Sequence, residues 1–314
     1  MIHGPCGGVT ANGLCEAAPE PCPFVDDVVL STPGNTEHRP RPTGLGTTLI
    51  DLVLPDDDAE LAAIADIYRT TGSTALVGEH LDDPRPHVPH IHAERLAAVG
   101  QPAVVTLTGR YRSVGEHDAE IAALVATGVV AVHCVTGDHP AARFGPDATA
   151  PFTLDGTGLA GRARDAGAIV STGESPTAPP VADRPARVVA KERAGADIVV
   201  LNHAGPTERL VAFADRCADA GAQLTLVAPV PVVTDEHSAR ALDQFPGLVL
   251  PDGLVDRVMA SSDPRRTGVE AAVTMGRALL DSGRFAALNL SGSEQGLTAV
   301  ERAELMASVA EAIG

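Results

Sequence analysis

Apolar and polar residues alternate along most of the chain with two different periods, which predicts strands that take turns with helices. Short, almost wholly apolar runs of strand length lie at residues 47–54, 74–78, 103–108, 129–135, 168–172, 197–202, 223–229 and 285–290. Longer amphipathic segments between or after them predict helices at residues 56–72, 117–128, 184–195, 207–221 and 297–314. Several of these segments end in glycine, a common helix stop signal.

Eight apolar strands separated by amphipathic helices are typical of a closed parallel barrel, in which both faces of each strand are covered. An open doubly wound sheet is the alternative, but it usually carries a glycine fingerprint after its first strand. The stretch "LIDLVLPDDD" has no such glycines. We therefore predict an α/β fold with a (β/α)8 TIM barrel over residues 45–314. A short irregular Cys/Gly/Pro-rich module and its linker, residues 1–44, precede the barrel.

The composition restricts the classes of function. A formal net charge of -18 argues against wholesale binding of nucleic acid or acidic membranes. The start of the chain lacks the charged and apolar regions of a secretory signal, and no apolar run is long enough to span a membrane, so we expect a cytoplasmic protein. Trp is absent and aromatic residues make up 3% of the chain, which leaves few residues for stacking.

Lys191 is the single lysine among 23 basic residues. Two interpretations stay open: a specific role that arginine does not fill, or a chance survivor of an arginine-rich composition.

Polar residues follow most of the predicted strands. Active sites of such barrels form at the carboxyl ends of the strands, which makes these residues the candidates for a site. They are Asp51, Gly78, Glu79, His80, Thr106, Thr108, Thr136, Gly137, Asp138, His139, Gly173, Glu174, Asn202, His203 and Asn289.

Four stretches of the chain resemble the methylenetetrahydrofolate reductase family. "VHCVTGDHP" resembles the family's apolar strand followed by Arg-Gly-Asp and proline, and "VVAKERAGADIVVLN" resembles its Lys, Ala-Gly-Ala and strand ending in Gln. "LIDLVLP" resembles the first-strand motif Phe-Glu-Phe-Phe-Pro, and "FAALN" resembles the eighth-strand ending Phe-Tyr-Thr-Leu-Asn. The resemblance covers roughly residues 45–314 and implies hydride transfer from NAD(P)H, through FAD, to the methylene group of 5,10-methylenetetrahydrofolate.

The resemblance also implies roles for single residues. Asp51 falls on the acid that assists protonation of the folate, Asp138 on the aspartate that binds and activates it, and Asn202 on the glutamine that orients the pterin. Lys191 falls on the lysine that contacts the FAD phosphate. The expected cofactor-binding set is Lys191, Thr106, Thr108, Thr136, Gly137 and Glu174.

The chain departs from the family pattern at positions near the flavin. "TLT" at residues 106–108 stands in place of His-Leu-Thr, "STGES" at residues 171–175 in place of Tyr-Pro-Glu, and Thr136 in place of the arginine. Two further readings are therefore open: a reductase that takes hydride directly from NAD(P)H, and a folate-binding paralogue that supports one-carbon transfer without flavin. A Schiff-base lyase using Lys191 is disfavoured, because this lysine lies inside a predicted helix.

Basic and imidazole side chains outside these motifs are less specific. Arg110 and Arg112 follow the third strand and either meet the glutamate tail of folate or are solvated; we favour solvation. The histidines of "PRPHVPHIH", His87, His90 and His92, lie in a predicted proline-rich loop, where we expect solvated side chains rather than a metal site.

The amino-terminal segment "GPCGGVTANGLCEAAPEPCPF" resembles a small cysteine module found beside such reductases. Its thiols, Cys6, Cys15 and Cys22, leave a tetrahedral zinc ion one ligand short. His3 or Cys134 is a candidate fourth ligand, and a loop of free thiols is an equal alternative. An iron-sulfur cluster is a weaker candidate for this module, because such a cluster usually needs four cysteines. The expected partners are the folate substrate and either a second copy of the chain or a methyltransferase protein.

Overall fold

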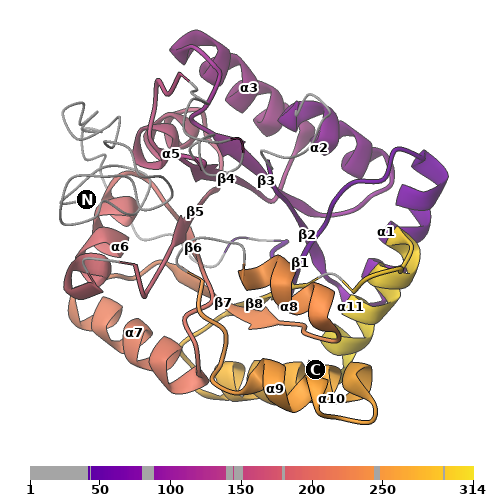
Figure 1. Cartoon of the computed structure of the whole chain (residues 1–314). Coiled ribbons are helices and arrows are strands. Elements are labelled where there is room, and N and C mark those ends of the chain that lie inside the picture. Colours follow the sequence, from indigo (N-terminus) through magenta and orange to yellow (C-terminus); the bar gives the residue numbers. More distant parts are fainter. Residues whose placement is uncertain are drawn as a thin grey trace.

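Eight parallel strands close into a barrel in the computed structural model (Figure 1). The structure describes residues 42, 44–79, 88–138, 144, 151–178, 181–243, 248–292 and 294–314. Each strand pairs with the next, and β1 closes the ring by pairing with β8. The strands are β1 (Thr48–Asp51), β2 (Thr74–Val77), β3 (Ala103–Thr108), β4 (Ala131–Val135), β5 (Val170–Glu174), β6 (Ile198–Leu201), β7 (Thr225–Pro231) and β8 (Ala287–Ser291).

Helices form a ring outside the strands (Figure 1). The ring closes where α11 packs against both α1 and α10. The described helices are α1 (Asp58–Thr71), α2 (Pro89–Ala98), α3 (Val114–Thr127), α5 (Gly156–Asp165), α6 (Arg184–Arg193), α7 (Thr207–Asp219), α8 (Glu236–Asp243), α9 (Leu254–Met259), α10 (Pro264–Asp281) and α11 (Ala299–Ile313).

Local capping explains where several helices start. The carboxylate of Asp57 accepts backbone hydrogen bonds at the start of α1. Ser113 and Glu116 form a capping box at α3, and Thr298 and Glu301 form another at α11. Each of these caps also sets where the loop between the preceding strand and the helix ends.

Two of the three apolar clusters among the described residues follow the alternation of side chains along each strand. One cluster fills the inside of the barrel, with residues such as Leu49, Val104, Ala131 and Ala287. The larger cluster lies between the strands and the helices, and includes Ile50, Val105, Val132 and Leu288. This alternation identifies which residue of each strand points towards the barrel axis.

The predicted barrel and its eight strands are confirmed, with strand ends shifted by a few residues. The five predicted helices are also present. The proline-rich stretch around His90 was wrongly predicted as a loop: residues 89–98 form a helix with proline in its first turn, where the missing N–H costs nothing. Of the predicted module and linker at residues 1–44, residues 1–41 and 43, with the three cysteines, lie outside the described residues.

Among the described helices, none combines the length and the apolar character that a membrane-spanning segment requires.

Candidate active site at the carboxyl end of the barrel

A layer of polar side chains lies inside the barrel, next to its apolar interior cluster. Each of these residues comes two positions after an apolar residue of that cluster, so it points to the same interior side of its strand. All lie nearer to the carboxyl end of the barrel than the apolar residue that they follow. We call this set the polar ring: Asp51, Thr106, His133, Ser171, Asn202 and Asn289.

Asp51 occupies the end of β1, next to the strand that carries Asn289. Asp51 is exposed to solvent, although the surrounding strands partly desolvate its carboxyl group. This desolvation raises the pKa of Asp51 to about 7, although a hydrogen bond from the Asn289 side chain opposes the rise. Asp51 is therefore a carboxyl group that can both hold and release a proton near neutral pH.

His133 and Ser171 form a pair across neighbouring strands of the same layer. The registers of β4 and β5 set them side by side, and His133 Nδ1 lies 2.8 Å from Ser171 Oγ. Burial, together with the positive charge of Lys191, lowers the pKa of His133 to about 4. The imidazole is therefore neutral at pH 7 and acts as a hydrogen-bonding group rather than as a cation.

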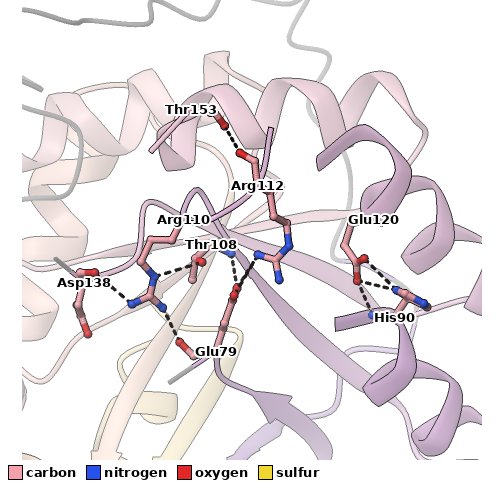
Figure 2. A network of polar contacts seen from close by, with 8 residues as sticks. All are labelled: Glu79, His90, Thr108, Arg110, Arg112, Glu120, Asp138 and Thr153. Carbon is pink, nitrogen blue, oxygen red and sulfur yellow. Dashed lines mark hydrogen bonds and ion pairs between the residues drawn. The ribbon is translucent and has the colours of Figure 1, made fainter. Parts of the chain in front are cut away.

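The loop that carries Asp138 is held by Arg110, which lies two residues beyond β3 (Figure 2). Arg110 donates to the backbone carbonyl oxygens of Asp138 at 3.1 Å and of Glu79 at 3.0 Å. The Glu79 carboxylate in turn accepts a hydrogen bond from Thr108 N at 2.8 Å and forms an ion pair with Arg112 at 3.0 Å. These contacts connect the loops after β2, β3 and β4 at the carboxyl end of the barrel.

The expectation that Arg110 and Arg112 are solvated is wrong. Arg110 is 2% exposed, and the Arg112 side chain is largely buried against Glu79. His90 also differs from expectation, because its ring and backbone N–H both contact the Glu120 carboxylate. In each case the partner comes from a distant part of the sequence.

Glu174, at the end of β5, is the centre of a buried cluster of charges. Its carboxylate contacts Lys191 at 2.7 Å and Arg184 at 3.0 Å. Burial by itself would raise the pKa of Glu174, but the charges of Lys191, Arg187 and Arg184 lower it to about 2. Lys191 also donates to the carbonyl oxygen of Gly173, so the single lysine ties α6 to β5.

The three predicted catalytic residues lie at the same end of the barrel. Asp51 ends β1, Asn202 follows β6 directly, and Asp138 lies three residues beyond β4. The side chains of all three are exposed. The structure therefore places all three residues at one end of the barrel, while a shared site and the role of each residue stay predictions.

The predicted flavin-binding residues do not fit a flavin. Thr136 Oγ1 accepts a hydrogen bond from Gly156 N, and Lys191 is bound to Glu174 and Gly173. Gly137 packs against Arg110, and Thr106 and Thr108 are buried. Because contacts within the chain already use these groups, we derive no step through FAD.

The predicted metal ligands lie outside the described residues, except for Cys134, one of the candidate fourth ligands. Cys134 lies in the core between β4 and the helices, where burial raises the pKa of its thiol. This position disfavours the thiolate form that binds zinc. In the part of the chain that the structure describes, no group of three His, Cys, Asp or Glu side chains is arranged to hold a metal ion.

Sequence reasoning missed the inward-facing part of the polar ring. His133 and Ser171 are interior residues of predicted strands, and each stands two positions after an apolar residue. The sequence shows this spacing of two residues. It does not show which face of each strand points towards the barrel axis, because that depends on how the strands pair.

The protein is therefore a (β/α)8 barrel that exposes a carboxylic acid, Asp51, an amide, Asn202, and a carboxylate, Asp138, at its carboxyl end. The sequence profile of the methylenetetrahydrofolate reductase family matches residues 175–300, less than half of the chain. This match includes Lys191, Asn202 and Asn289, but neither Asp51 nor Asp138.

Among solved structures, the barrel is similar to that of an uncharacterized protein from Clostridium thermocellum that binds two copies of 5-methyl-5,6,7,8-tetrahydrofolic acid. The TM-score is 0.58 at 12% sequence identity, and the match covers 85% of this chain and 95% of the other. At this identity the similarity concerns the fold. No curated protein matches the chain significantly.

Proposed function

We propose that this protein binds a reduced folate at the carboxyl end of its barrel and reduces the methylene group of 5,10-methylenetetrahydrofolate. The hydride would come directly from NAD(P)H. Both the family match over residues 175–300 and the folate bound by the structural neighbour support a folate as the ligand.

Asp51 is the observation that carries the proposal. A reductase of this kind needs a proton to open the five-membered ring of methylenetetrahydrofolate before hydride can add to the resulting iminium ion. Asp51 has a pKa of about 7 and an accessible side chain, which suits a general acid near neutral pH. In this mechanism Asp51 donates its proton to the folate, directly or through a water molecule.

Asp138 and Asn202 would hold the pterin in place. The pterin ring presents several N–H donors and a carbonyl acceptor, which match a carboxylate and an amide. The negative charge of Asp138 would also favour the cationic iminium ion over the neutral closed ring. Arg110 contributes indirectly, because it fixes the backbone of Asp138.

A second candidate function is folate binding in support of one-carbon transfer, without reduction. The structural neighbour supports this alternative, because it binds 5-methyl-5,6,7,8-tetrahydrofolic acid. Under this reading, Asp138 and Asn202 keep their binding roles and Asp51 has no proton to deliver.

Two measurements on the purified protein separate these functions. The first is the visible absorption spectrum, which reports bound flavin. The second is NADH or NADPH oxidation with 5,10-methylenetetrahydrofolate, followed by identification of 5-methyltetrahydrofolate. We expect reductase activity without flavin absorption. Folate binding in calorimetry without oxidation of either nucleotide would favour the binding function, and no affinity for folates would contradict both.

A further inference from the structure

Tyr111 adopts a backbone conformation that its side chain disfavours. Its φ angle is +62°, and among the described residues other than glycine no other φ is positive. The left-handed region brings Cβ close to the backbone, so bulky residues adopt it rarely and at a cost. Such an outlier persists only where the surrounding structure enforces it.

The contacts of its neighbours explain why the chain turns at this point. Arg110 reaches the carbonyl oxygen of Glu79, and Arg112 reaches the carboxylate of the same residue. The backbone N–H of Tyr111 donates to the carbonyl oxygen of Pro151 at 2.9 Å. This turn needs a residue in the left-handed conformation, which glycine or asparagine adopts at a lower energetic cost than tyrosine. The contacts account for the conformation, but they do not account for a tyrosine.

The side chain of Tyr111 is 54% exposed at the carboxyl end of the barrel. The chain has two tyrosines, six phenylalanines and no tryptophan, and the other tyrosine, Tyr68, is 2% exposed in the core. The Tyr111 ring centroid lies 6.0 Å from the guanidinium carbon of Arg110, which binds the backbone of Asp138. An exposed aromatic ring therefore lies one side chain away from a predicted folate-binding residue.

We propose that Tyr111 provides a stacking surface for the p-aminobenzoyl ring of the bound folate. In a folate this aryl ring follows the pterin, so it lies outside the pterin when the pterin contacts Asp138 and Asn202. Tyr111 is exposed, and its ring lies beside Arg110, which holds the Asp138 backbone, so it is a candidate for that outer position. Stacking of planar rings on tyrosine contributes to the affinity for a ligand, which gives the exposed ring a role that glycine or asparagine lacks. This inference rests on the proposed function, because it assumes a folate in the site.

The test compares two substitutions with two ligands. Tyr111→Asn relieves the strained φ and removes the ring, whereas Tyr111→Phe keeps both the ring and the strain. The first ligand is 5-methyltetrahydrofolate, and the second is 6-methyltetrahydropterin, which lacks the aryl ring. Ile91→Ala is the control, because Ile91 is also exposed but lies on α2.

We expect Tyr111→Asn to bind 5-methyltetrahydrofolate roughly tenfold more weakly than the wild-type protein. Its affinity for the pterin should be unchanged, and its thermal unfolding midpoint should be equal or higher, because the strain is relieved. Tyr111→Phe and Ile91→Ala should bind both ligands as the wild-type protein does. A structural role alone would lower the unfolding midpoint of Tyr111→Asn and weaken both ligands equally.

The outcomes separate this inference from the proposed function. If the wild-type protein binds 5-methyltetrahydrofolate and Tyr111→Asn binds it equally well, the stacking role is wrong and the proposed function stands. If the wild-type protein binds no folate, both are wrong. Should Tyr111→Asn not fold, Tyr111→Leu keeps the bulk without the aromatic face, and the same loss of folate affinity is expected.

Discussion

Asp51 and Glu174 are two carboxyl groups of the same barrel whose pKa values move in opposite directions. Burial dominates at Asp51 and raises its pKa to about 7, whereas three cations surround Glu174 and lower its pKa to about 2. Environments that separate pKa values in this way often distinguish a proton donor from a fixed charge. At the scale of single residues, Asp51 has the properties of the acid and Glu174 those of a structural anion.

Replacing Asp51 should remove the proton donor and leave folate binding intact. We expect Asp51→Asn to lower kcat by about 100-fold or more, with the affinity for 5-methyltetrahydrofolate changed only slightly. The protonated acid exists below its pKa, so wild-type kcat/KM should fall as the pH rises through about 7. The exposed Asp66→Asn is the control. An unchanged pH profile in Asp51→Asn would assign the proton to another group.

Glu174 should stabilise the fold in a pH-dependent way. Its pKa is lowered in the folded state, so its contribution is fully present above about pH 4.5 and is lost as the pH falls towards 2. Because Glu174→Gln leaves buried cations without their partner, we expect about 3 kcal/mol of destabilisation at pH 7. Urea unfolding at several pH values measures both effects.

A surface ion pair provides the matched control for this experiment. Glu236 and Arg240 form an ion pair on α8, with both side chains about two-thirds exposed. Glu236→Gln should cost less than about 0.5 kcal/mol, because exposed pairs contribute little. Equal losses in the two variants would show that burial does not strengthen the Glu174 pair.

At the scale of elements, the loop after β4 depends on close packing against β3. Gly137 has a φ of +86°, and a Cβ at this position would lie 2.8 Å from Arg110 Nε and 2.9 Å from Thr108 Cβ. Any side chain here would displace the guanidinium that holds the Asp138 backbone. The glycine therefore maintains the position of a predicted catalytic residue.

Two glycine substitutions can separate the effect of close packing at Gly137 from the free-energy cost of a positive φ angle. Gly100 has a φ of +69°, and its added Cβ would meet no atom within 4 Å, so Gly100→Ala should cost about 1 kcal/mol. Gly137→Ala should cost about 1–3 kcal/mol more, because it also crowds Arg110 and Thr108. Chemical denaturation of both variants measures the difference. Equal losses would mean that the loop adapts to the methyl group.

The elements themselves could be predicted from the sequence, because hydrophobic periodicity directly reflects which face of a segment is buried. The contacts that define the loops could not. Arg110 finds its acceptors at residues 79 and 138, and His90 finds its partner on α3. No local pattern shows such partners, so solvation was predicted for side chains that the fold buries or pairs.

At the scale of the whole molecule, the order of strands was enough to predict the end of the barrel at which the candidate residues lie. In a parallel barrel the carboxyl ends of all strands lie on the same side, so Asp51, Asp138 and Asn202 had to lie on that side if the barrel closed. The inward-facing members of the polar ring could be assigned only from the register of the strands in the folded barrel. The interior position of His133 is the clearest example.

The pairing of β1 with β8 has a consequence for when Asp51 acquires its raised pKa. Asp51 and Asn289 stand on opposite sides of the seam where the first strand meets the last. The environment that tunes this acid does not exist until the final strand has been synthesised and docked. A half-barrel fragment without β8 could fold in part, but its Asp51 would lack the neighbouring strand and Asn289. A pKa of about 7 at Asp51 would therefore indicate that β8 has paired with β1 and closed the barrel.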